Sequence, residues 1–99
     1  MPLVQEDTFG GYFKARPGQG RDADRTTIEG LGFTILTEEP RAGETKMWVY
    51  GPGSSVDTAI NDFDLKVTLP GYFFPLPVGE ELTETLVRSW TDRENLFFN

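Results

Sequence analysis

The chain has 99 residues and a formal net charge of −7, from 9 basic and 16 acidic side chains, and it contains neither cysteine nor histidine. A chain of this length can bury one modest core, so we expect a single domain spanning residues 1–99. The absence of cysteine excludes disulfides and thiolate metal sites, and the absence of histidine removes the usual general base and nearly every zinc site. We therefore expect no enzymatic activity, no cofactor and no bound metal.

The acidic balance also restricts the expected partners. Binding to nucleic-acid phosphates requires a basic face, so a net charge of −7 disfavours nucleic acid and anionic membrane surfaces. No apolar run approaches the roughly 20 residues of a membrane helix. The start of the chain, MPLVQEDTF, carries acid where a signal peptide carries Lys or Arg. We expect synthesis and use in the cytoplasm, or in a particle assembled there.

The first quarter of the chain, residues 1–25, is predicted to be an extended region that contacts other subunits. Residues 8–15 (TFGGYFKA) favour a strand, in which the glycine pair indicates a bulge or a close approach of another backbone. Residues 16–25 (RPGQGRDADR) hold Pro, Gly and charges but no large apolar group, which is typical of an exposed loop. Its basic residues are either solvated or form a positive arm that contacts an acidic partner surface. These candidate interface residues are Arg16, Arg21 and Arg25.

Two strands are predicted in the middle of the chain. Residues 26–37 favour a strand that is strongest over 31–36, and residues 45–50 favour another with apolar groups on both faces. The polar stretch 38–44 between them contains Pro and Gly, which favour a turn. The two strands are therefore expected to form an antiparallel hairpin.

The clearest strand pattern lies at residues 63–69 (FDLKVTL), where apolar and polar residues alternate before a turn at Pro70-Gly71. The following apolar run, 72–78 (YFFPLPV), contains two prolines and is expected to be an edge strand or an extended polyproline-like segment. Its rings either fill the core or form a docking surface. The candidate docking residues are Tyr72, Phe73 and Phe74.

Helical character is predicted at two places. Residues 56–61 can form one or two turns capped by Ser54 or Ser55. Across residues 80–89 apolar side chains recur every four positions, which favours a helix, although an alternating strand pattern is also present. The tail, residues 91–99, is expected to contact other subunits through its large apolar residues. These are Leu96, Phe97 and Phe98.

The elements together predict a mainly β fold: a small antiparallel β-sandwich or partly open barrel with one or two short helical segments. The alternative is an α+β roll with a C-terminal helix packed on the sheet. In either fold the chain carries more apolar surface than a small interior can hide.

We therefore expect a non-enzymatic structural subunit of a large ordered assembly, most nearly a small virion component such as a phage capsid-decorating cement protein or a tail or connector piece. Its partners would be a larger shell or tube protein and copies of itself. Two alternatives stay open. One is an acidic inhibitor that mimics nucleic acid, a hypothesis that the negative net charge supports. The other is a β-sandwich module that binds carbohydrate through aromatic rings, for which the candidates are Trp48, Tyr50, Tyr72 and Trp90.

Overall fold

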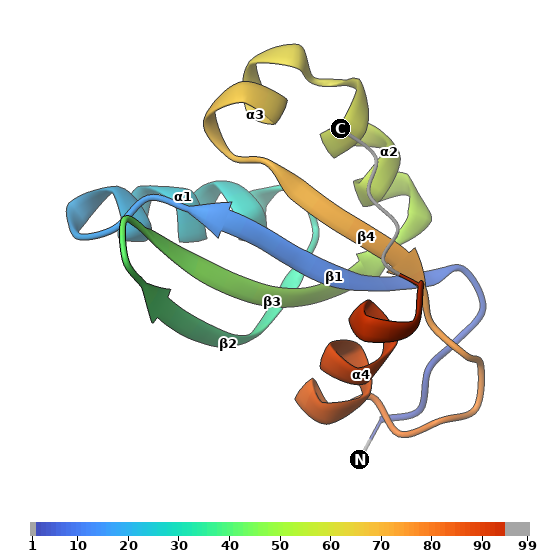
Figure 1. The fold of residues 1–99 in the computed structure, drawn as a ribbon. Helices are drawn as coiled ribbons and strands as arrows, with labels where there is room; N and C mark the ends of the chain where they lie inside the picture. Colours follow the sequence, from blue (N-terminus) through green and yellow to red (C-terminus); the bar gives the residue numbers. More distant parts are fainter. Residues whose placement is uncertain (1, 95–99) are drawn as a thin grey trace.

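The structure, a computed structural model, describes residues 2–94, without the side chains of residues 91–94. The described part of the chain forms four strands and four helices (Figure 1). In chain order they are β1 (Thr8–Ala15), α1 (Gln19–Gly30), β2 (Thr34–Arg41), β3 (Glu44–Pro52), α2 (Gly53–Asn61), α3 (Phe63–Thr68), β4 (Gly71–Pro75) and α4 (Glu84–Glu94). None of these helices is long and apolar enough to cross a membrane.

The four strands form one antiparallel sheet in the order β2-β3-β1-β4. β1 pairs with β3 on one side and β4 on the other, and β2 pairs with β3 at the far edge. Because each neighbour is antiparallel, β1 and β2 run parallel with β3 between them, and α1 connects them. In the same way β3 and β4 run parallel with β1 between them, and α2 and α3 connect them. This is the split β-α-β arrangement, in which two interleaved crossover units build one sheet.

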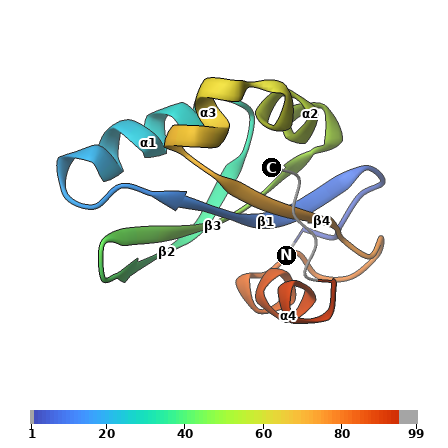
Figure 2. The ribbon, with the colours of Figure 1, turned by 45° about the horizontal axis from the view of Figure 1, so that its top comes forward.

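The predicted class, a small antiparallel β-rich fold with short helical segments, is confirmed. All strands in residues 2–94 belong to one sheet, so there is no second sheet to complete a sandwich or barrel, and the fold is the α+β form of this class. Helices α1, α2 and α3 lie on one face of the sheet and α4 lies on the other (Figures 1 and 2). The helix favoured over residues 80–89 is present as α4, but it begins at Glu84 and continues to Glu94.

The two sheet faces bury two separate apolar clusters, because neighbouring residues of a strand point to opposite faces. Phe73 points toward α1–α3 and Phe74 toward α4, and each ring is only 1% exposed. In the first cluster Phe33 stacks on Phe73 with ring centroids 5.4 Å apart, and Phe13 meets both rings edge-on. The second cluster lies between the sheet and α4. It consists of Val4, Trp48, Phe74, Leu76, Leu82 and Val87.

The strand predicted over residues 63–69 is wrong, because this stretch begins with helix α3. The Asp62 side chain accepts a hydrogen bond of 3.0 Å from the Leu65 amide and caps the helix. Leu65 and Leu69 are four residues apart, and residues at this spacing lie on the same side of a helix. A helical turn can therefore direct both side chains toward the core. The remaining apolar residues of the stretch, Phe63 and Val67, are left in solvent.

The loop predicted over residues 16–25, and the start of the strand predicted after it, are also wrong, since helix α1 occupies Gln19–Gly30. The buried face of α1 consists of Asp24 and Ile28, four residues apart. One of these two positions carries a charge, so the sequence shows no apolar repeat there. Gly32, with φ 105, follows the helix and lets the chain turn into β2.

Several local predictions are confirmed. The strand over residues 8–15 is β1, residues 45–50 lie within β3, and residues 56–61 lie within α2. The hairpin is β2–β3, with a shorter turn than expected because β2 continues to Arg41. The run after Pro70-Gly71 begins with the edge strand β4. The close backbone approach expected at the glycine pair is found at Gly11, where a Cβ atom would collide with the Tyr72 carbonyl oxygen of β4.

Candidate functional site

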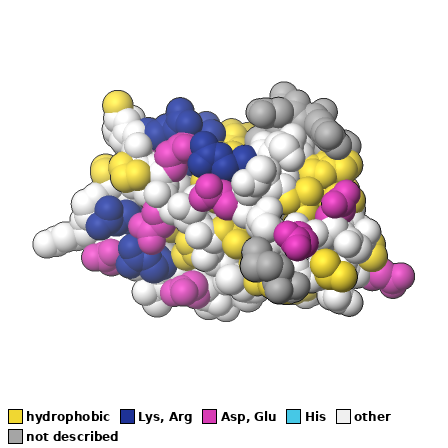
Figure 3. All heavy atoms as spheres, turned by 90° about the horizontal axis from the view of Figure 1, so that it is seen from below, with side chains coloured by type: hydrophobic (Ala, Val, Ile, Leu, Met, Phe, Trp, Pro, Cys, Tyr) yellow, Lys and Arg dark blue, Asp and Glu magenta, His cyan; other side chains and the backbone are white. Residues whose placement is uncertain are grey.

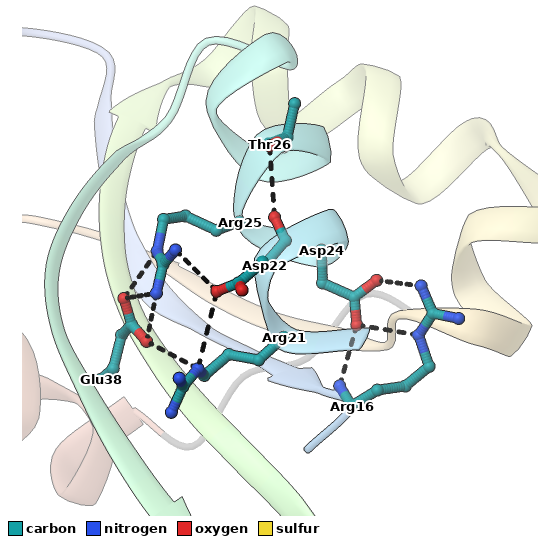
Figure 4. A network of polar contacts seen from close by, with 7 residues as sticks. All are labelled: Arg16, Arg21, Asp22, Asp24, Arg25, Thr26 and Glu38. Carbon is teal, nitrogen blue, oxygen red and sulfur yellow. Dashed lines mark hydrogen bonds and ion pairs between the residues drawn. The ribbon is translucent and has the colours of Figure 1, made fainter. Parts of the chain in front are cut away.

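The arginines predicted as a positive arm are held by carboxylates of the same chain (Figure 4). Arg25, on α1, donates to both oxygens of Glu38 on β2 at 2.8 and 2.9 Å and to Asp22 at 3.0 Å. Arg21 lies 3.6 Å from Glu38. The hydrogen bond from Arg25 holds the pKa of Glu38 below its ordinary value, with the positive charges of Arg25 and Arg21 adding to the effect. These contacts join α1 to the edge strand β2.

Arg16 forms a second pair with Asp24, which is 5% exposed. The guanidinium donates to both carboxylate oxygens, at 2.8 and 3.2 Å, and the Arg16 backbone amide donates to the same carboxylate at 2.8 Å. A buried carboxylate needs such partners, because an unpaired buried charge is costly. The pair therefore fastens the end of β1 to α1.

Every arginine whose side chain is described forms an ion pair within the chain. On the other side of the sheet Arg41 and Arg88 both contact Glu39 of β2, at 2.6 and 2.7 Å. The predicted interface role of Arg16, Arg21 and Arg25 stays a prediction. In this structure the three side chains form ion pairs with carboxylates of the same chain.

The other predicted interface residues are separated by the fold. Phe73 and Phe74 are core residues, so neither ring offers a surface to a partner in this fold. Tyr72 is half-buried and lies on the sheet face that carries α4, next to Tyr12. The remaining candidates lie outside the described residues; they are Leu96, Phe97 and Phe98.

The rings proposed for carbohydrate binding are also partly hidden. Trp48 is only 4% exposed, and it lies under α4 in the second cluster. Tyr50, Tyr72 and Trp90 are half-buried. A sugar-stacking platform requires an open ring face, so Trp48 is unsuited to that role without movement of α4.

A surface formed by α2 and α3 was missed in the sequence. Phe63 and Val67 lie one helical turn apart on α3 and are 76% and 66% exposed. Beside Phe63 is a shallow groove of about 620 Å³ that is wide open to solvent. The groove is lined by Asp57, Thr58, Asn61, Asp62, Phe63 and Asp64; together with Val67 these residues are called the α2–α3 surface below.

The α2–α3 surface combines exposed apolar groups with negative charge. Asp57, Asp62 and Asp64 have no ion-pair partner among the side chains described in residues 2–90. In that same part of the chain no three acidic side chains lie close enough to hold a metal ion. The chemistry of this surface is therefore that of an acidic rim around an apolar anchor. The signal that could have revealed it is the Phe63–Val67 spacing of four.

The opposite sheet face carries a second group that the sequence did not indicate. Tyr12 of β1 pairs in register with Trp48 of β3 and with Tyr72 of β4, so the three side chains form an aromatic row across the sheet. Both ring-centroid distances are 5.1 Å. Lys14 and Lys46 face each other in the next row and are called the lysine pair.

Comparison with protein-family models, with curated proteins and with solved structures finds no match to this chain.

Proposed function

We propose that this chain is a non-enzymatic structural subunit that binds a larger protein assembly through the α2–α3 surface. A small virion component, such as a capsid-stabilising cement protein or a tail or connector piece, is the member of this class that best fits a small, acidic chain without cysteine or histidine. The observation that supports the proposal is the exposure of two large apolar side chains, Phe63 and Val67, on one side of α3.

The exposed anchors give this surface binding energy that the isolated chain does not use. Fully burying a Phe or Val side chain contributes about 1.5–3 kcal/mol, and about two-thirds to three-quarters of each side chain is still accessible. Docking both anchors would supply about 2–4 kcal/mol, a factor of roughly 30 to 1,000 in affinity. Aromatic anchors near the centre of an interface commonly carry most of its energy.

The carboxylates define the chemistry of the partner. Asp57, Asp62 and Asp64 surround Phe63 and are not neutralised by a described side chain of this chain. A complementary partner would present an apolar pocket with Lys or Arg at its rim, because opposite potentials across an interface steer association and reject wrong partners. The proposed partner is therefore a shell or tube protein with a basic, apolar docking pocket.

Site-specific photo-crosslinking tests the proposal in the cells that make the protein. A photoreactive phenylalanine analogue is placed at position 63, and the same analogue at the exposed Glu29 position of α1 is the matched control. We expect one discrete protein adduct from position 63, lost when Val67→Asp is added, and no such adduct from position 29. Equal adducts from both positions, or an adduct that survives Val67→Asp, would refute docking through this surface.

A further inference from the structure

A second binding surface lies on the opposite face of the sheet, where the aromatic row and the lysine pair meet. Lys46 Nζ lies 4.3 Å from the Tyr12 ring centroid and 5.2 Å from that of Trp48. Lys14 Nζ lies 5.1 Å from the Tyr72 ring centroid. The two ammonium groups therefore rest on the rings of the neighbouring row.

The lysine pair is a local excess of positive charge. Lys14 and Lys46 are directly opposite in the β1–β3 register, an arrangement in which like charges repel. Neither forms an ion pair with a described side chain. Burial lowers the pKa of Lys46, and the positive charges of Arg41 and Lys14 lower it further against the opposing effect of Glu39 and Glu44. An anion placed here would relieve this repulsion.

The charged side chains near the lysine pair are of both signs, whereas the chain as a whole has a net charge of −7. Glu39, on the same face, is already shared by Arg41 and Arg88. Glu44, two residues from Lys46 on the same face of β3, forms no ion pair with a described side chain and opposes the lowering of the Lys46 pKa. The unpaired carboxylates of the α2–α3 surface belong to helices on the other face of the sheet (Figure 2). Figure 3, which views the face that carries α4, shows Lys and Arg side chains gathered at one end, interleaved with Asp and Glu side chains.

Part of the aromatic row lies outside the half of the sheet face that α4 covers. α4 covers only one half of this face, and no described helix lies under the half where β1 ends and β3 begins (Figures 1 and 2). Arg88 of α4, 5.0 Å from the Trp48 ring, marks the boundary. Trp48 is buried there, whereas Tyr12 and Tyr72 are half-buried. The part of the platform that α4 does not cover therefore consists of Tyr12, Tyr72 and the lysine pair.

We propose that this face binds single-stranded nucleic acid, with bases stacked on Tyr12 and Tyr72 and phosphates held by Lys14 and Lys46. Aromatic rings that stack bases beside cations that follow the backbone are the combination such binding requires. The ammonium groups move from the ring faces to the phosphates when the strand binds, which uncovers the rings. This role uses the face opposite the α2–α3 surface and does not depend on the docking proposed above.

Fluorescence anisotropy with a labelled oligothymidylate 12-mer tests the proposal. Two phosphate contacts predict a slope of about −1.4 for the logarithm of the binding constant against the logarithm of the salt concentration. Lys46→Ala is expected to weaken binding and to reduce the slope to about −0.7. The matched control is Lys66→Ala, which removes another lysine without an ion-pair partner from α3, on the other face; it should change neither quantity.

The stacking contribution is tested separately from the charge. Tyr12→Leu, which keeps an apolar group of similar size on the sheet, should weaken binding by about tenfold without changing the slope. Tyr72→Leu provides a second variant if the first fails to fold. Equal affinity for polyglutamate or for a duplex of the same charge, an unchanged affinity in the Tyr variants, or an equal loss with Lys66→Ala would each overturn the proposal, as would the absence of binding at about 20 mM salt.

Discussion

Two phenylalanines of the same chain provide a direct test of which apolar groups the fold uses. Phe73 is 1% exposed and contacts both Phe13 and Phe33, at centroid distances of 5.2 and 5.4 Å. Replacement by alanine removes the ring and leaves a cavity, which costs about 3–5 kcal/mol. Phe63 is 76% exposed, so the same replacement there removes only about a quarter of a side chain's burial, worth about 0.5 kcal/mol.

Urea denaturation followed by circular dichroism measures both free energies of unfolding. A domain of this kind has a total stability of about 5–15 kcal/mol, so we expect Phe73→Ala to be marginally folded and Phe63→Ala to be indistinguishable from the parent chain. Both variants replace phenylalanine by alanine, so any difference between their free energies of unfolding reflects the two positions and not the type of side chain. If Phe63→Ala lowered the free energy of unfolding by more than about 2 kcal/mol, the Phe63 ring would be packed within the fold and not available to a partner.

Four further substitutions, one of them a control, test the ion pair of β2, the β1–β4 contact and the cap of α3. Glu38→Gln should destabilise the protein at neutral pH by at most about 1 kcal/mol. The pKa of Glu38 is lower in the folded state than in the unfolded state, so the ionised carboxylate stabilises the fold above the unfolded pKa, and this stabilisation should be lost as the pH falls through the folded pKa. Unfolding curves recorded from about pH 7 to 3 measure this loss. Gly11→Ala should cost more than about 2 kcal/mol by forcing β4 away from β1, whereas Gly30→Ala, with open space around it, should be neutral or stabilising in the same thermal unfolding assay. Asp62→Ala should cost about 1 kcal/mol and accelerate hydrogen exchange at the Leu65 amide, since the cap of α3 is lost.

The aromatic and apolar content of the chain is divided by the fold in a way that the sequence did not predict. The rings of the apolar run beginning at Tyr72 were expected either to fill the core or to form a docking surface, and Phe73 and Phe74 lie in the core, one in each cluster. The most exposed large apolar side chains are Phe63 and Val67 of α3; Val78, at the end of the same run, and Leu3 are exposed as well. The apolar surface that the described residues leave exposed is therefore divided between α3 and these two positions.

Local chemistry alone was sufficient to predict β1, the β2–β3 hairpin, α2 and α4. The two strand predictions follow from alternation and turn residues and the two helix predictions from apolar spacing. The predicted cap of α2 is wrong, because Ser54 and Ser55 lie inside the helix and Pro52 precedes it without a side-chain cap. The absence of cysteine and histidine, and the chemistry this excludes, also follow from the sequence without a fold.

Only the tertiary structure decided the states of α1 and α3. Among the described strands the outer ones, β2 and β4, each have a neighbour on one side only, so the availability of a sheet edge did not decide the state of residues 63–68. This stretch packs Leu65 against the core as a helix, helped by the Asp62 cap. In α1 the buried face includes Asp24, whose charge is satisfied by Arg16 eight residues earlier. Burial depends on contacts between residues distant in the chain, and no local period encodes which side of an element those contacts will cover.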